Sequence, residues 1–148
     1  MKLDGTDRKI LNLMQENARR SFKDMAKRVG VSEATIFVRV KKLVNGGVIK
    51  AFRAVVDPQV VGKGTLAFVL LKANPNKYDK VLEALSKMED VYEIYDVTGP
   101  HYAILKVRAG SQDELAGIID KIGSIDGVTS TETDVVLRNV KEDLILHL

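Results

Sequence analysis

The 148-residue sequence contains no cysteine and only two histidines. Without cysteine the chain forms no disulfide framework and performs no thiol chemistry, which fits a reducing compartment such as the cytoplasm. The sequence also offers no cluster of residues with the spacing of a metal site, so we expect neither a metal nor a cofactor. His101 stands in a loop beside Pro100 and His147 lies at the end of the chain, and we expect both to be surface residues rather than catalysts.

Long hydrophobic runs are absent as well. No apolar stretch reaches the roughly 20 residues that a membrane-spanning helix needs, and the opening MKLDGTDRK lacks the apolar core of a signal peptide. Gly62-Lys63-Gly64 is too short for a phosphate-binding glycine motif and is interpreted as part of a hinge. These absences predict a cytoplasmic protein that is not an enzyme and has no membrane partner.

Charge is distributed unevenly along the chain, although the net charge is only +3. Residues 1–50 hold twelve Lys and Arg against five Asp and Glu, a balance of +7, whereas residues 51–148 hold eleven against fifteen, a balance of −4. This asymmetry is typical of a small nucleic-acid-binding head on a body that does not bind nucleic acid. The alternative is chance clustering of charges on a solvated surface.

Residues 21–49 predict two helices joined by a tight turn. Ser21 is a good N-cap with Asp24 three residues later, and Gly30 stands where a left-handed residue ends a helix. Ser32 then caps a second helix, so that only about three residues separate the two, as in a helix-turn-helix. Two amphipathic core helices of any small α domain would show the same spacing, so the pattern alone leaves DNA binding and that alternative open.

The second of these helices has an inner and an outer face. Ile36, Val40 and Leu43 recur at helical spacing and are expected to face the core. The opposite face carries the side chains that would meet DNA. Phosphate contacts are expected from Arg19, Arg20, Arg39, Lys41, Lys42 and the helix N-terminus at Ser32, and base contacts from Ala34, Thr35, Phe37 and Val38.

The rest of the chain predicts a three-helix head, a hinge and an α/β body. A first helix capped by Asp4 completes a head over residues 1–50, residues 51–64 form an extended hinge, and residues 65–148 form the body. Strands are expected over 66–73, 91–98, 102–107 and 128–140, with helices after 78 and after Ser111. The order β-α-β-β-α-β is that of a ferredoxin-like domain.

Both faces of the first expected strand are apolar, with Leu66, Phe68 and Leu70 alternating with a second apolar set. Two helices cover only one face of such a sheet. A second copy of the chain is therefore the partner expected on the other face.

Taken together, these residues resemble the Lrp/AsnC family of leucine-responsive, or feast/famine, regulators over essentially the whole chain. The matching positions in the head and hinge are Leu3-Asp4, Asp7, Ile10-Leu11, Arg19, Ala26, Val31-Ser32, Thr35-Ile36, Arg39, Leu43, Gly47-Val48-Ile49, Asp57-Pro58 and Gly62. Those in the body are Val97-Thr98-Gly99, Ile122-Gly123 and Gly127-Val128.

The resemblance implies an α+β fold: an N-terminal three-helix, winged-type helix-turn-helix head joined by a hinge to a C-terminal ferredoxin-like domain. It also implies a homodimer that assembles further into a tetramer or octamer, binds double-stranded DNA and responds to an amino-acid effector held between dimers. The effector residues that it points to are Thr98, Gly99, Tyr102, Asp120, Thr131 and Thr133.

The sequence departs from the family pattern at two places. Tyr102 stands where the loop of relatives usually carries an aspartate, so the obvious partner for a ligand's ammonium group is missing. Phe37 and Val38 make the DNA-facing surface apolar, and apolar groups in the major groove read chiefly the thymine methyl. We therefore expect an AT-rich operator. The alternative is an architectural, nucleoid-type protein that coats DNA without a ligand.

Overall fold

The computed structural model describes residues 2–148, and their contacts divide the chain into two compact units. The head unit comprises the residues up to Val55 together with Lys141–Leu148, and the sheet unit comprises Val56–Val140. The chain therefore passes between the units twice, once after Val55 and once after Val140.

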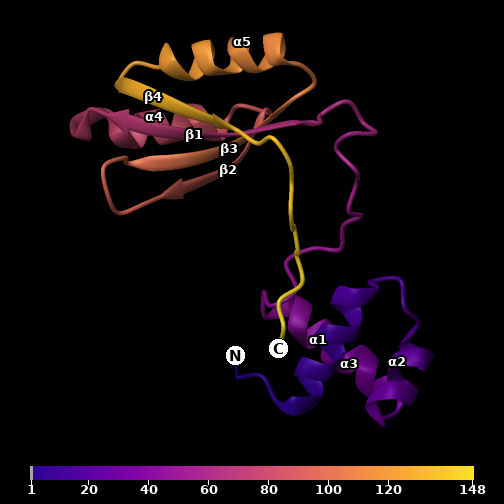
Figure 1. The fold of residues 1–148 in the computed structure, drawn as a ribbon. Helices are drawn as coiled ribbons and strands as arrows, with labels where there is room; N and C mark the ends of the chain where they lie inside the picture. Colours follow the sequence, from indigo (N-terminus) through magenta and orange to yellow (C-terminus); the bar gives the residue numbers. More distant parts are fainter. Residues whose placement is uncertain (1) are drawn as a thin grey trace. The chain divides into compact units, whose positions relative to one another are not determined.

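Three helices form the head unit: α1 (Gly5–Glu16), α2 (Phe22–Val29) and α3 (Glu33–Asn45) (Figure 1). Each begins at the cap that the sequence predicts. The Asp4 carboxylate accepts from the backbone N–H of Asp7 at 2.8 Å, and Ser21 and Ser32 accept from the third residue of their helices at 3.1 Å. Gly30 ends α2 with φ of +81°, a left-handed conformation that glycine adopts without steric cost.

The inner faces of the three helices share one core. Ile10, Met25, Ile36 and Leu43 are completely buried, and Val40 is nearly so. The predicted division of α3 into an inner and an outer face is confirmed, because its three inward positions are all buried. After α3, residues 48–56 carry neither helix nor strand, so no β-wing forms from them in the single chain.

The sheet unit contains β1 (Thr65–Ala73), the single turn η1 (Pro75–Lys77), α4 (Tyr78–Ser86), β2 (Val91–Asp96), β3 (Ala103–Ala109), α5 (Gln112–Gly123) and β4 (Val128–Val135). The four strands form one antiparallel sheet in the order β2-β3-β1-β4. This element order and strand order confirm the predicted ferredoxin-like βαββαβ domain.

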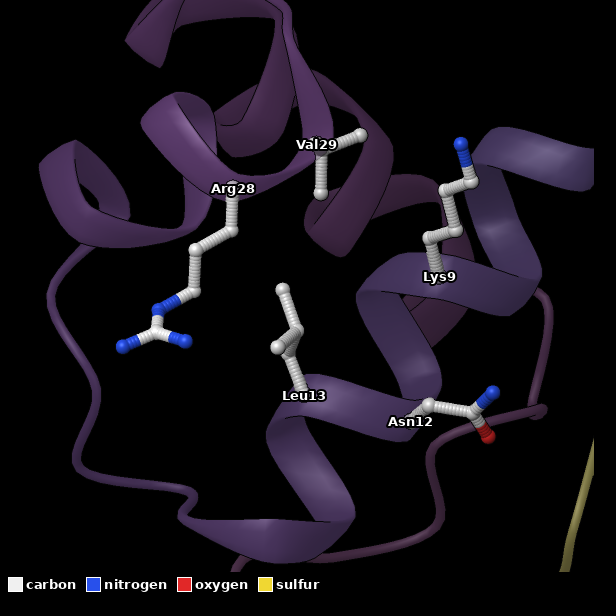
Figure 2. Close-up of a pocket in the computed structure, with 5 residues that line it drawn as sticks. All are labelled: Lys9, Asn12, Leu13, Arg28 and Val29. Carbon is white, nitrogen blue, oxygen red and sulfur yellow. The ribbon is translucent and has the colours of Figure 1, made fainter.

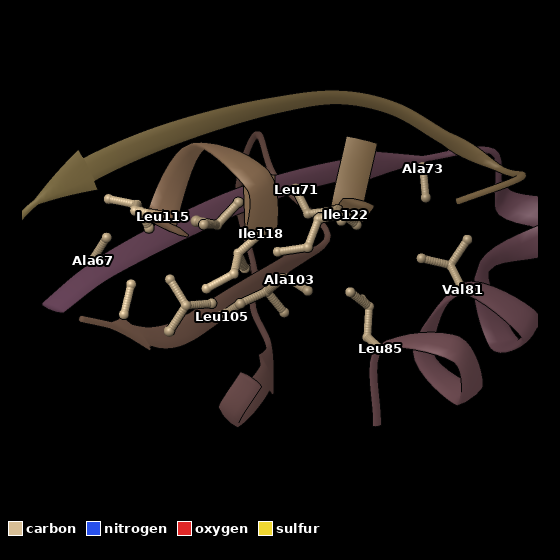
Figure 3. Close-up of a cluster of buried hydrophobic side chains, with 13 residues drawn as sticks. Ala67, Leu71, Ala73, Val81, Leu85, Ala103, Leu105, Leu115, Ile118 and Ile122 are labelled. Atoms are coloured by element: carbon tan, nitrogen blue, oxygen red, sulfur yellow. The ribbon is translucent and has the colours of Figure 1, made fainter. Parts of the chain in front are cut away.

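One face of the sheet is covered by α4 and α5. Side chains from α5, including Leu115, Ile118 and Ile122, and from α4, including Val81 and Leu85, point into the core (Figure 3). They pack on the buried alternate positions of the central strands, which are Ala67, Val69, Leu71 and Ala73 on β1 and Ala103, Leu105, Val107 and Ala109 on β3.

The last strand is shorter than the sequence predicts. It was expected to continue to Val140 but ends at Val135. The reason lies in its neighbour: β1 starts at Thr65, and the backbone N–H of Val136 donates to the carbonyl of Leu66 at 2.9 Å. Beyond that bond β1 offers almost no backbone for further pairing, so the chain leaves the sheet.

The other face of the sheet, here called the open face, has an apolar centre with charges on both sides. Leu66, Phe68 and Leu70 of β1 occupy its middle and are half-buried. The β3 partners of Leu66 and Phe68 are Arg108 and Lys106, and the β4 partners of Phe68 and Leu70 are Asp134 and Glu132. No helix among the described residues covers this face, and none of them is long and apolar enough to cross a membrane.

The end of the predicted hinge is fixed to the sheet unit. The Lys63 ammonium group donates to Glu114 at 2.6 Å and to Asp90 at 3.1 Å. The hydrogen bond from Lys63 holds the pKa of Glu114 below its usual value, and the two carboxylates raise the pKa of Lys63. A Cβ on Gly110 would lie 2.7 Å from the carbonyl oxygen of Gly62, so the close packing here requires glycine.

Candidate DNA-binding and effector sites

The outward face of α3 presents an apolar surface with cations beside it. Val38 is 62% exposed, and Ala34, Thr35, Val38 and Arg39 line a shallow hollow of about 270 Å³. Phe37 lies next to this surface, with its ring in edge-to-face contact with Phe22 at a centroid distance of 6.2 Å. Such a helix can enter a major groove and contact base edges without offering many hydrogen bonds.

The cations predicted to meet phosphates fall into two groups. Lys41, Lys42 and Arg19 are exposed, and within the described chain none of the three forms an ion pair. Arg20 is instead held by Glu16 at 3.2 Å and Asp24 at 2.8 Å, with its side chain only 16% exposed. The first group is thus available for phosphate, whereas Arg20 already has carboxylate partners.

Arg39 also has partners inside the head. Its guanidinium donates to Asp7 at 3.0 Å and to Asp4, so it joins α3 to the first turn of α1. Asp7 is 1% exposed and is the buried charged residue of this core. The hydrogen bond from Arg39 lowers the pKa of Asp4 and raises that of Arg39 itself. This arrangement makes Arg39 a positioning residue of the recognition helix.

A second hollow, of about 230 Å³, lies between α1 and α2 and was not anticipated from the sequence. Leu13 and Val29 extend into it, with Lys9 and Asn12 from α1 on one side and Arg28 from α2 on the other (Figure 2). Its residues come from two helices and share no sequence motif, so only the packing of α1 on α2 could have brought them together.

The residues predicted to bind an effector form two separate groups. Thr98, Gly99 and Tyr102 lie in the loop between β2 and β3, where Gly99 has φ of +122°. Thr131 and Thr133 lie on the edge strand β4, on the helix-covered face, and Asp120 is exposed on α5. Tyr102 donates its backbone N–H to Leu71, whose partner on the other side is Thr131, so two strand spacings, about 9–10 Å, separate the backbones of Tyr102 and Thr131.

A carboxylate does lie against the loop, although Tyr102 replaces the expected acidic residue. The Tyr78 hydroxyl donates to Asp96 and to the carbonyl of Tyr102, the latter at 3.1 Å. The rings of Tyr78 and Tyr102 are in contact at 5.3 Å, and burial together with Asp96 raises the pKa of Tyr78. The sequence pattern singled out neither Tyr78 nor Asp96 as a site residue.

His101 is less exposed than its place in a Pro-flanked loop suggests. Its side chain is only 13% exposed, and its Nε2 lies 3.3 Å from a carboxylate oxygen of Glu132 without hydrogen-bond alignment. The loop therefore folds back over β1 towards β4, which a Pro-flanked position in the sequence did not suggest. Among the described residues there is no group of three or more His, Asp or Glu placed to hold a metal ion.

Comparison with known proteins gives both units a family. The AsnC-type helix-turn-helix domain matches residues 3–44, and the Lrp/AsnC ligand binding domain matches residues 66–146. The chain belongs to the Lrp/AsnC family. It is a helix-turn-helix transcriptional regulator, with a DNA-binding head and a ligand-binding domain.

Curated relatives agree with this Lrp/AsnC assignment. The HTH-type transcriptional regulator FL11 of Pyrococcus horikoshii is 39% identical over 140 residues, covering 95% of this chain and 93% of its own length. The protein of the same name from Pyrococcus abyssi is 39% identical over 142 residues, with coverages of 96% and 94%.

Solved structures show the same Lrp/AsnC fold over the full chain. Escherichia coli AsnC is 35% identical with a TM-score of 0.93, covering 98% of this chain and 99% of its own. A regulator from Neisseria meningitidis solved with L-methionine is 25% identical with a TM-score of 0.92, at coverages of 98% and 96%. A feast or famine regulatory protein from Mycobacterium tuberculosis, also solved with L-methionine, is 26% identical with a TM-score of 0.93, at 99% and 100%.

Proposed function

We propose that this Lrp/AsnC regulator is a cytoplasmic homodimer, assembling further into a tetramer or octamer, that binds an AT-rich operator through paired α3 helices and responds to an amino acid or a related small molecule. The observation that carries the DNA part is the outer face of α3, where exposed Ala34 and Val38 stand next to the unpaired cations Lys41 and Lys42. Membership of the family indicates a role in transcription regulation, and the outer face of α3 indicates what kind of DNA sequence it would bind.

Affinity should come mainly from phosphate contacts. Lys41, Lys42 and Arg19 supply charge, and the α3 N-terminus at Ser32 supplies backbone N–H groups. Arg20 and Arg39 are paired with carboxylates inside the head. They would support DNA binding by holding the helices in place rather than by contacting phosphate. Thr35, Ala34, Val38 and Phe37 would then contact base edges, with thymine methyl groups as the favoured partners.

The open face of the sheet supports the dimer. Its apolar centre, Leu66, Phe68 and Leu70, is flanked by cations on β3 and by anions on β4. A two-fold axis parallel to the strands would place the basic β3 of one copy opposite the acidic β4 of the other, and the same contact then forms twice. The face is therefore complementary to itself in both apolarity and charge.

The effector is proposed to bind near the β2–β3 loop and the α5–β4 edge, through Thr98, Gly99, Tyr102, Asp120, Thr131 and Thr133. The two relatives solved with L-methionine support an amino acid or a close analogue. Because the two groups of residues lie on different sides of β1 in one chain, a second copy would be needed to complete one cavity. Asp96, which accepts from Tyr78, is available as a carboxylate beside the loop.

Selection of binding sites from random duplexes tests the DNA proposal. An AT-rich consensus with two half-sites about one helical turn apart is expected, since each head of a dimer reads one half-site. A GC-rich consensus would contradict the proposed reading face. Binding that does not weaken as salt rises would contradict the phosphate contacts.

Thermal-shift screening with the twenty amino acids tests the effector. A ligand that binds only the folded protein raises its melting temperature, and 100-fold excess over Kd adds about 2.7 kcal/mol. Asp120→Ala and Thr131→Val should each reduce the shift. The absence of a shift with every amino acid would rule out a free amino acid as the effector.

The second candidate is a ligand-independent architectural protein that coats DNA. The apolar outer face of α3 favours this architectural role, because such a face makes few base-specific hydrogen bonds. Footprinting separates the two, because a regulator protects discrete operators while a coat protects all sequences alike. We propose no catalytic role, and turnover of an amino-acid derivative would overturn that position.

A further inference from the structure

The C-terminal segment, Lys141–Leu148, contacts α1 through a specific set of hydrogen bonds. The side-chain amide of Gln15 donates to the carbonyl of Leu146 at 2.9 Å and accepts from the N–H of the same residue at 2.8 Å. One turn earlier on α1, Asn12 donates to the carbonyl oxygen of Leu148 at 3.1 Å. In Figure 1 the yellow end of the chain lies beside α1.

The spacing of these bonds fits an extended peptide on a helix. Side chains three residues apart on a helix lie about 5–6 Å apart. Backbone groups two residues apart in an extended chain lie about 6.6 Å apart, so Asn12 and Gln15 match residues 148 and 146. The Gln15 side-chain amide bonds both the N–H and the carbonyl of Leu146, as a neighbouring strand would in a β-sheet, and these two hydrogen bonds fix the register of the segment.

The family match and the contacts in the structure assign this C-terminal segment to different units. By sequence, residues up to 146 fall within the match to the ligand binding domain, and by contact the segment belongs to the head. The opposite end of α1 holds the recognition helix, because Asp4 and Asp7 bind Arg39 of α3. A continuous set of contacts therefore runs from the chain beyond β4, through α1, to α3.

We infer that the outer face of α1, at Asn12 and Gln15, is a docking site for the chain's own C-terminal segment, and that docking gives the DNA-binding head a second tether besides residues 51–62. The inference rests on the proposed function, since it concerns how a dimer places two heads on DNA. Two tethers restrict the orientations of a head more than one does, which raises the effective concentration of the second head once the first has bound.

The test uses the full chain, Gln15→Ala, and a chain ending at Val140. Neither change removes a residue of either hydrophobic core, so both variants should fold. Gln112→Ala is the matched control, because it removes an exposed glutamine from α5. Hydrogen–deuterium exchange of the C-terminal peptide is expected to speed up in Gln15→Ala and to stay slow in the control.

DNA binding supplies the second measurement, with A·T-rich duplexes of about 12 and about 40 base pairs, which admit one head and two heads respectively. Affinity for the short duplex should be unchanged in both variants, while affinity for the long duplex should fall about three- to tenfold. Trypsin cleavage after Lys50 and Arg53 should become severalfold faster, and this readout needs no DNA.

Three results are decisive. If the C-terminal peptide of the parent protein exchanges freely, the docking site does not exist in solution. If Gln15→Ala frees the segment but changes neither the long-duplex affinity nor the cleavage rate, docking does not restrict the head. If the parent binds neither duplex, the proposed function fails. Hydrogen–deuterium exchange then still tests whether the segment docks, and trypsin cleavage still tests whether docking restricts the head.

Discussion

The charged residues of the head fall into two groups: some form ion pairs that hold the helices together, and others are exposed and available to bind DNA. Arg39 meets a buried carboxylate, Asp7, and also Asp4, whereas Lys41, two residues further along α3, has no such partner among the described residues. Removing the partner of a buried charge leaves that charge uncompensated, while removing a solvated charge costs the fold little. The two cations should therefore respond differently to the same substitution.

We expect Arg39→Ala to lower the melting temperature by several degrees and Lys41→Ala to leave it unchanged. Lys41→Ala should instead weaken DNA binding on all sequences and reduce the slope of log K against log salt by about one. Calorimetry and salt-dependent binding measure the two effects. Equal melting temperatures for Arg39→Ala and the parent would show that the ion pairs do not hold α3.

Gly127, just before β4, is a position where the backbone requires glycine. Its φ is +107°, and an added Cβ would lie 2.8 Å from Cβ of Lys77 and 2.9 Å from Val81. Gly127→Ala should destabilise the protein by about 1–3 kcal/mol, the cost of a strained backbone residue. Gly117→Ala, in the middle of α5 with open space around it, should stabilise by about 0.5–1 kcal/mol. Urea unfolding measures both, and a neutral Gly127→Ala would show that this turn relaxes.

At the scale of elements, the short helices of the head are held by their caps and by ion pairs across turns. Asp24 in the first turn of α2 binds Arg20, which precedes the helix, and Arg28, one turn further on. Both hydrogen bonds lower the pKa of Asp24 below its ordinary value of 3.8. The start and the last turn of α2 thus depend on one ionised carboxylate.

This pKa shift predicts a pH dependence. Because the pKa is lower in the folded state, the pair stabilises the protein above pH 3.8, and the contribution is lost as the pH falls through the folded-state pKa. Asp24→Asn should lower the melting temperature at neutral pH, and the gap to the parent should close as the solution is acidified below that range. Circular dichroism melts at several pH values test this, and a gap that stays constant with pH would exclude the carboxylate's charge as its cause.

At the scale of the whole molecule, the open face of the sheet is the surface proposed to join two copies of the chain. Phe68 lies at its centre, between Lys106 on β3 and Asp134 on β4, and its side chain points away from α4 and α5. An apolar centre of this kind stabilises a partner by removing its surface from water. A charge placed there should oppose assembly without disturbing the core on the other face.

Phe68→Glu is expected to shift the protein to the monomer mass of 16.4 kDa, whereas the parent should have at least twice that mass. Ala116→Glu, which adds the same charge on the exposed side of α5, should leave the dimer intact. Light scattering coupled to size exclusion measures both masses. A dimeric Phe68→Glu would place the interface elsewhere.

The sequence by itself determined the helices of the head and the order of strands and helices in the body. Those features depend on caps, glycines and periodic apolar residues within a few positions of one another, so the signal is local. The outer face of α3 followed from the same periodicity. The boundaries of the domains and the residues that bind DNA and effector stay predictions.

Only the tertiary structure decided which polar groups far apart in the sequence meet. Arg39 binds carboxylates 32 and 35 positions away, and Gln15 binds a residue 131 positions away, so no local pattern could reveal either contact. The low exposure of His101 and the early end of β4 likewise depend on where other strands start and stop. Folding brings such distant groups together to satisfy buried charge and backbone hydrogen bonds, and that requirement is a property of the packed chain rather than of any short segment.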